Sequence, residues 1–181
     1  MKKNYYEFPK SSFLGMEKDT SIIMRKILEN KNLLKLLYYT TPDWETKDDL
    51  TAEQIKEMFD KKQISNIPQI KVDKDNYSAN YLRVVFDLFS PNATNPEYRD
   101  HTVEIKILCA FDNWGLDNFA LRPYKIAGEI DSMLDGQYLT GIGRLSFLGA
   151  EQTVADNEFG GISLQYLAIR GNEDKVNPLS E

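Results

Sequence analysis

The segment from Val103 to Leu148 constrains the fold most, because the spacing of its apolar residues changes twice. Apolar and polar residues first alternate up to Phe111, which is typical of a strand with one buried face. The turn-forming residues Asp112–Gly115 end this strand. A helical spacing follows from Asn118 to Leu134, and Ile142–Leu148 then alternates again. The segment therefore predicts a strand, a helix that crosses the sheet, and a second strand.

The predicted helix has recognisable signals at both ends. We expect Asp117 to cap its start, Pro123 to lie in its first turn and Gly136 to stand just beyond its end. Its apolar stripe comprises Phe119, Ile126, Ile130, Met133 and Leu134. Burial of these side chains against the sheet is expected to anchor the whole unit.

Further periodic segments complete the predicted fold. A broad apolar stripe predicts a second main helix over Ser21–Leu37, bent where Glu29–Asn32 interrupts it. The predicted strands are Tyr81–Phe89, Val103–Phe111, Ile142–Leu148 and Gly161–Ile169, with a short edge strand at Ile67–Val72. The fold class is therefore α+β, with a four- to five-stranded mixed or antiparallel sheet and the two helices on one face.

The length of 181 residues suits a single domain with a proper core. Residues 1–18 are expected to form an N-terminal arm, residues 19–171 a single α+β domain, and residues 172–181 a polar C-terminal tail. Residues 38–62 combine Pro42 with several acidic residues and a short helix that begins at Thr51. We interpret them as a surface excursion of the domain.

The composition argues against several classes of protein. A net charge of −6 disfavours a general nucleic-acid binder, which needs clustered Lys and Arg. The single cysteine precludes an intramolecular disulfide. No secretory signal is visible, and the longest apolar runs are far shorter than a membrane span. The chain is therefore expected to be made and kept in a cytoplasm, without membrane partners.

The chain contains few residues suited to catalysis. One histidine, His101, and one cysteine, Cys109, cannot build a usual zinc site. His101 is interpreted as a solvated or hydrogen-bonded residue and Cys109 as a small core residue. The run Pro42–Lys47 contains the letters of a nuclease metal motif, but compressed into one linker. The sequence therefore predicts no catalytic, cofactor-binding or metal-binding residues and a non-enzymatic protein.

The connection Ser90–His101 is the one feature that the core does not explain. Twelve residues are long for a hairpin connection, and long connections are often functional. Its two prolines stiffen it, and its polar residues suit a wet, specific protein contact. The candidate interface residues are Pro91, Asn92, Thr94, Asn95, Glu97, Tyr98 and Arg99.

Three stretches, Ser90–Pro96, Leu121–Asp131 and Phe159–Ile162, carry a resemblance that extends over roughly Tyr81–Arg170. Together with the order of elements, this region resembles the tail terminator and related neck proteins of long-tailed bacteriophages. Residues 38–62 lie outside the resemblance.

The resemblance implies a structural protein of the phage virion, made in the host cytoplasm and located in the neck or tail. Such proteins form rings, typically of six copies. The implied partners are further copies of the chain, the tail tube protein, the head connector or adaptor and, in a contractile tail, the sheath. Genomic DNA would pass through the ring without specific binding. Two alternatives remain: a head-completion (stopper or adaptor) ring, and a small metal-dependent nuclease using Asp43 and Glu45.

Overall fold

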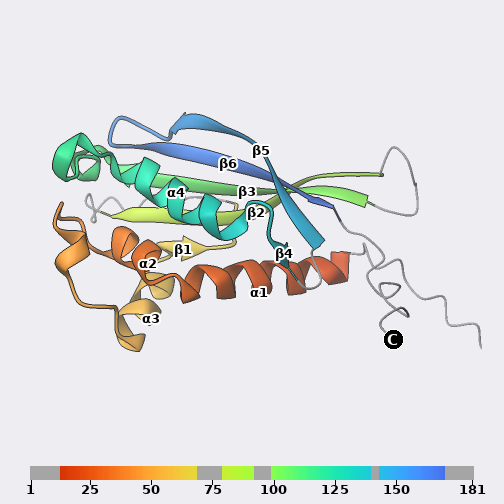
Figure 1. Cartoon of the computed structure of the whole chain (residues 1–181), viewed down its shortest axis with the longest axis horizontal. Coiled ribbons are helices and arrows are strands. Elements are labelled where there is room, and N and C mark those ends of the chain that lie inside the picture. The colour runs from red at the N-terminus through yellow and green to blue at the C-terminus, as the bar shows by residue number, and fades with distance from the viewer. Residues whose placement is uncertain (1–12, 69–78, 92–98, 140–142, 170–181) are drawn as a thin grey trace, which may run out of the picture.

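A computed structural model describes residues 13–68, 79–91, 99–139 and 143–169. Its centre is a six-stranded mixed sheet in the order β1-β2-β3-β6-β5-β4 (Figure 1). The strands are β1 (Ile64–Ser65), β2 (Asn80–Pro91), β3 (Arg99–Ala110), β4 (Tyr138–Leu139), β5 (Gly143–Val154) and β6 (Phe159–Ile169). The predicted α+β class is confirmed. The sheet has more strands than predicted, because β1 and β4 are too short to give a periodic signal.

Within the described residues the sheet is mixed, with one parallel pair of strands. β1 runs parallel to β2, whereas every other neighbouring pair is antiparallel. One row across the long ladders joins Phe86, Val103, Tyr166 and Phe147. Alternate residues of the central strands therefore share the face that the helices cover.

The helices pack on that face. They are α1 (Phe13–Glu29), α2 (Lys31–Tyr38), α3 (Ala52–Asp60) and α4 (Arg122–Leu134). α1 and α2 contact β2, and α4 contacts β3, β6 and β5 (Figure 1). On α4, Ile126, Ile130 and Leu134 are fully buried. Each contributes roughly 1.5–3 kcal/mol to folding by leaving water.

The N-terminal helix differs from the prediction in its start but not in its interruption. α1 begins at Phe13, inside the segment predicted to be an arm, and residues 1–12 lie outside the described part of the chain. The predicted bend is present at Asn30, whose side chain accepts from the Leu33 backbone N–H at 3.0 Å and caps α2. One broad apolar stripe is therefore divided between two helices.

The start of α4 is a correction to the prediction. The helix begins at Arg122, with Pro123 in its first turn, and Gly136 follows its end with φ +67° as expected. Residues Asp117–Phe119 form a separate 3-10 turn, so Asp117 does not cap α4. Phe119 is fully exposed rather than part of the buried stripe. Its helical spacing to Ile126 is accidental, because the chain changes direction between them.

The long hairpin connection is also shorter than predicted. β2 continues to Pro91 and β3 begins at Arg99, so Phe89, Ser90 and Pro91 pair with His101, Asp100 and Arg99. Bulged pairing between Phe86 and Phe89 hides this extension from a strict alternation pattern. Residues 92–98 lie outside the described residues. The short strand predicted at Ile67–Val72 is not formed at Ile67, and the part from residue 69 onward is not described.

Residues 38–62 are more deeply integrated than a surface excursion. Trp44, in a short 3-10 turn, and Met58, on α3, are both buried members of the main core. α3 begins with the predicted capping box, in which Thr51 and Gln54 exchange hydrogen bonds at 2.9 and 3.3 Å. Two widely spaced apolar residues thus anchor a polar linker, which periodicity does not reveal.

Candidate interaction surface

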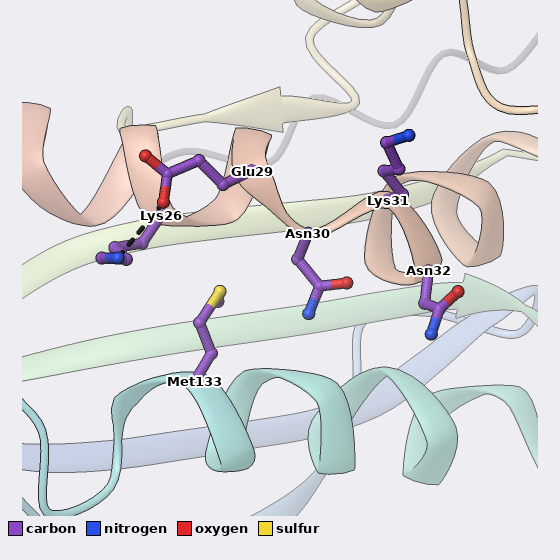
Figure 2. Close-up of a pocket in the computed structure, with 6 residues that line it drawn as sticks. All are labelled: Lys26, Glu29, Asn30, Lys31, Asn32 and Met133. Atoms are coloured by element: carbon purple, nitrogen blue, oxygen red, sulfur yellow. Dashed lines mark hydrogen bonds and ion pairs between the residues drawn. The ribbon is translucent and has the colours of Figure 1, made fainter.

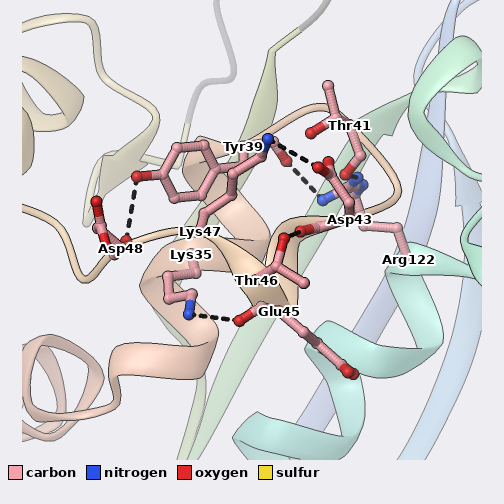
Figure 3. A network of polar contacts seen from close by, with 9 residues as sticks. All are labelled: Lys35, Tyr39, Thr41, Asp43, Glu45, Thr46, Lys47, Asp48 and Arg122. Atoms are coloured by element: carbon pink, nitrogen blue, oxygen red, sulfur yellow. Dashed lines mark hydrogen bonds and ion pairs between the residues drawn. The ribbon is translucent and has the colours of Figure 1, made fainter.

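Arg122 joins the end of α2 to the start of α4. Its side chain is fully buried, and burial lowers the pKa of its guanidinium, which still remains charged at neutral pH. It donates to the backbone carbonyls of Asn113 (2.8 Å), Leu36 (2.9 Å), Tyr39 (2.6 Å) and Thr41 (2.8 Å), and Figure 3 shows its contacts with the linker. These carbonyls include one that α2 cannot satisfy internally. A single cation thus holds three separate segments together.

Asn80 extends this network at the start of β2. Its side-chain amide donates to the carbonyls of Leu36 and Leu37 at 3.3 and 3.2 Å, and its side-chain oxygen accepts from Asn113 at 3.5 Å. Asn80 is fully buried and Asn113 is nearly so. The end of α2 is therefore fixed to the sheet and to the segment after β3.

The linker after α2 packs against the same network (Figure 3). Lys35 donates to the Glu45 carbonyl at 3.0 Å, and Tyr39 donates through its hydroxyl to the Asp48 carbonyl at 3.1 Å. Asp43 forms an ion pair with Lys47 at 2.8 Å. The hydrogen bond from Lys47 lowers the pKa of the Asp43 carboxyl.

This pairing bears on the nuclease motif in Pro42–Lys47. The lysine of the motif closes on the aspartate of the same motif, although a nuclease needs both carboxylates to converge on a metal. A pocket of about 270 Å³ adjoins the motif; it is lined by Pro42, Asp43, Trp44, Glu45, Thr46, Leu116, Asp117, Asn118, Ala120 and Lys125. Within the described parts of the chain, no three His, Cys, Asp or Glu residues are grouped to hold a metal ion.

The loop between β3 and α4 carries strained backbone. Asn118 and Phe119 have φ values of +58° and +61°, a conformation that is uncommon for residues other than glycine. Hydrogen bonds from Leu116 to the Ala120 carbonyl (2.9 Å) and from Arg122 to the Trp114 carbonyl (2.8 Å) hold the loop closed. The loop presents Phe119 to solvent with a relative exposure of 102%. Strain that places a large apolar side chain in water points to a role outside folding.

Further exposed apolar side chains lie at the same end of the sheet, where this loop and the β5–β6 turn are found (Figure 1). We call this surface the aromatic end; its residues are Phe111, Phe119, Leu121, Tyr124 and Val154, all at least 39% exposed. Tyr124 accepts a hydrogen bond from the side-chain amide of Gln152 at 2.9 Å, which links α4 to β5.

Gly160 explains how Phe111 reaches this surface. A Cβ atom at Gly160 would lie 2.9 Å from the Phe111 ring, and Gly160 pairs with Val154 across the β5–β6 ladder. The absence of a side chain at Gly160 lets the ring lie over β6, beside Trp114 at 5.3 Å between centroids. Exposed carboxylates surround the surface, at Asp112, Asp117, Asp156 and Glu158. An apolar centre with a charged rim is the usual anatomy of a protein contact.

A model of the YomW family matches residues 30–168. The chain belongs to the YomW family. This family is phage-derived, of the Bacillus SPbeta-like type, which indicates a phage protein. No curated protein and no solved structure matches the chain. The YomW match includes residues 38–62, which the sequence resemblance had left outside.

Of the seven predicted interface residues of this YomW chain, the two that are described lie at the other end of the sheet. Pro91 and Arg99 form the last described pair of the β2–β3 ladder. The remaining predicted residues, Asn92, Thr94, Asn95, Glu97 and Tyr98, lie outside the described residues. The aromatic end was missed because Phe119 was assigned to the buried stripe. The run of turn residues before Leu121 was the signal that could have separated it from α4.

The histidine and the cysteine are both in the interior. His101 is 4% exposed, beside the Phe86 ring and 4.0 Å from the Asp19 carboxylate, so it is not solvated. Cys109 is fully buried as predicted, and burial raises the pKa of its thiol to about 12. A thiol held protonated in the core is a poor nucleophile.

A second opening, of about 420 Å³, lies between the α1–α2 junction and α4 (Figure 2). Its walls carry a Lys26–Glu29 ion pair at 3.2 Å, and Met133 approaches from α4. Asn30 donates to Glu129 at 2.9 Å and ties the junction to α4. Lys31 pairs with Asp49 at 2.6 Å, so four of the polar lining residues are engaged in structural contacts. No helix in the described ranges is long and apolar enough to cross a membrane.

Proposed function

We propose that this chain is a non-enzymatic structural subunit of a phage virion: a ring-forming tail terminator or neck protein that joins the tail tube to the head connector. The aromatic end carries the proposal. It holds large apolar side chains in water on a strained loop, anchored by the buried Arg122. Membership of a phage-derived family supports a role in the particle.

The proposed partners are other copies of the chain, six in one ring, together with the tail tube protein and the head connector. The aromatic end and the last described pair of β2 and β3, Pro91–Arg99, lie at opposite ends of the sheet (Figure 1). Two separate contact surfaces suit a subunit between two neighbouring components. The acidic rim of the aromatic end favours a basic surface on the component that it meets.

The test uses a phage that encodes this chain and lacks a working copy, complemented in the host with plasmid-borne variants. Electron microscopy of the lysate without complementation should show filled heads and separate tails. Phe119→Ser should complement poorly. The purified variant should nevertheless melt like the parent, because the Phe119 side chain is fully exposed and contributes little to folding. Ile67→Ser, which also removes an exposed apolar side chain but lies outside the aromatic end, is the control. Normal particles with Phe119→Ser would reject the proposed surface.

Two further measurements separate the alternatives. Antibody labelling of intact particles distinguishes a terminator ring at the tail from a head-completion ring at the portal. Asp43→Asn together with Glu45→Gln tests the nuclease. On our proposal this double variant complements fully, because both side chains are exposed and the neck role needs no carboxylate chemistry. Loss of phage with a folded double variant would favour the enzyme.

A further inference from the structure

β5 is the outer strand of the sheet over most of its length. β4 pairs only with Gly143 and Arg144, and the Leu145 backbone bonds to Gly136 and Gln137, so the edge beyond Leu145 has no strand partner among the described residues. From Leu145 to Val154 the strand contains no Lys or Pro and a single charged residue, Glu151. Those are the residues that usually prevent an edge strand from pairing with another chain. Val154, at 71% exposed, and Leu148, at 53%, add apolar side chains to this edge.

The ladder shows which backbone groups of β5 are free. Ala155 donates to the Phe159 carbonyl at 2.9 Å, and the register continues as Val154 opposite Gly160. Because hydrogen-bonded and non-hydrogen-bonded pairs alternate in an antiparallel ladder, the N–H and C=O groups of Ala150, Gln152 and Val154 point away from β6. Nearer β4, the Phe147 N–H donates to the Asp135 carboxylate at 2.9 Å, and Leu148 is the extra residue of a bulge.

We propose that β5 pairs with β5 of a second copy of this chain, antiparallel about a two-fold axis at Gln152. In this register Gln152 faces its own counterpart and Ala150 faces Val154 of the other copy. All three residues with outward backbone groups are then used, in three pairs that each exchange two hydrogen bonds. The contact joins two sheets edge to edge, with both helix layers on the same side.

The self-complementarity of this register is the argument for a second copy. Glu151 then lies opposite Thr153, so no like charges meet. A shift by one residue per strand toward β4 places Glu151 opposite Glu151, which is unfavourable. A further shift, to an axis at Ala150, brings the bulge at Leu148 opposite Gln152. An axis at Thr153, one step the other way, also avoids both problems but pairs only Gln152 with Val154 and leaves Ala150 unused. The axis at Gln152 is therefore the register that uses all three outward residues without repulsion or a bulge.

This inference is independent of the ring, because a two-fold contact closes on itself whereas ring contacts are head-to-tail. It is tested by disulfide trapping on the full chain carrying Cys109→Ala, which removes the one native cysteine. Gln152→Cys places two sulfurs at a directly opposed pair, within the Cα separation that a disulfide spans. Thr153→Cys is the control, because residues 153 of the two copies stand on a diagonal about 7–8 Å apart.

Mild oxidation with a glutathione redox buffer should convert most of the Gln152→Cys protein to a covalent dimer on a non-reducing gel. The control should form at least tenfold less. In solution the protein with its native residues should show twice the 20.9 kDa chain mass, or a multiple of that dimer. Gln152→Lys, which opposes two cations at the axis, should weaken dimerisation at least tenfold, whereas Glu151→Lys should not.

Equal trapping at both positions, or a monomeric native chain at 100 µM, would overturn the pairing. A folded Gln152→Cys protein, verified by its thermal melt, that does not cross-link would overturn it too. The particle experiments on Phe119 decide the virion role separately. A trapped dimer with no effect on head-to-tail joining would leave the pairing intact and reject the neck function.

Discussion

At the scale of single residues, Arg122 has the widest reach, since four backbone carbonyls from two distant segments accept from it. Arg122→Met keeps the apolar stem but leaves the carbonyls of Asn113 and Tyr39 without this donor and removes one of the two donors to Leu36, at about 1–3 kcal/mol for each unsatisfied group. We expect the free energy of unfolding in urea to fall by at least about 3 kcal/mol. Lys125→Met, at an exposed position of the same helix, should change it by less than about 0.5 kcal/mol. Equal midpoints for the two variants would contradict the role of Arg122.

Two strand glycines provide a second prediction at this scale. A Cβ atom at Gly161 would lie 1.9 Å from the Ile107 carbonyl oxygen, whereas a Cβ atom at Gly149 would have no neighbour within 4 Å. Gly161→Ala must push β6 away from β3 and should cost about 3 kcal/mol or more, or prevent folding. Gly149→Ala should be neutral within about 0.5 kcal/mol. Thermal melts of both variants check this, and a stable Gly161→Ala protein would show that the two strands are less closely apposed.

Cys109 predicts a pH dependence. Its thiol keeps its proton up to pH about 12 in the folded chain, against an ordinary value of 9.0. Between these values the unfolded chain has lost a proton that the folded chain retains, so stability falls as pH rises. Cys109→Ala should lower stability at pH 7 through lost packing, but it should reduce the loss of stability from pH 9 upward. Urea titrations at pH 7, 9 and 10 measure how the free energy of unfolding of the native chain and of Cys109→Ala changes with pH. Parallel slopes would show that the thiol does not contribute.

At the scale of elements, the spacing of apolar residues predicted the helices and strands that bury one face in the core. The stripe Ile126, Ile130 and Leu134 and the alternation in Val103–Phe111 specified α4 and most of β3. Gly136 marked the end of α4 as expected, with its positive φ. These signals are local, because burial of one face imposes its period on the residues that carry it.

Features that depend on contacts between residues far apart in the chain could not be predicted from the sequence. Arg122 looks like any surface cation of a helix until the carbonyls of Leu36, Tyr39 and Thr41 surround it. Trp44 anchors the linker through the tertiary core rather than through a pattern. The exposure of Phe119 follows from a chain reversal that Asn118 and Phe119 make with positive φ. The roles of Arg122 and Trp44 do not depend on neighbouring residues in sequence alone, whereas the turn residues before Leu121 are a local signal for the reversal at Phe119.

The β2–β3 hairpin yields a prediction for an element. Replacing residues 92–98 by Asn-Gly keeps the Pro91–Arg99 pair next to a two-residue turn, which suits an antiparallel ladder. The melting temperature should stay close to that of the parent, because the ladder retains its described pairs. On the proposed neck role, the shortened chain should fail to join heads to tails. Normal particle yield would exclude the candidate residues Asn92, Thr94, Asn95, Glu97 and Tyr98 as contacts, and would leave the aromatic end as the surface to examine.

At the scale of the whole molecule, most of the exposed large apolar side chains among the described residues lie in two adjacent places, the aromatic end and β5, whereas Ile67, Leu88 and Tyr138 lie elsewhere. Tyr124 and Gln152 connect them through a hydrogen bond at 2.9 Å. A partner bound at one surface therefore has a defined position relative to the other surface. In a particle, the proposed two-fold pairing would also set the spacing of two aromatic ends.

Charge is also a property of the whole molecule, and it leads to the final prediction. The chain has 22 basic and 28 acidic residues, for a net charge of −6. Among the described residues the bases Lys35, Arg83 and Arg122 and the acids Asp19 and Glu104 are buried, so burial withdraws more basic than acidic charge from the surface. DNA binding depends on neutralising phosphates with exposed cations. Purified protein should therefore not retard duplex or single-stranded DNA at 150 mM salt, even at tens of micromolar. Lys47→Glu, which adds to the acidic surface, should behave in the same way. Retardation by the native chain that Lys47→Glu abolishes would contradict a passive lumen and support DNA chemistry at the Asp43 linker.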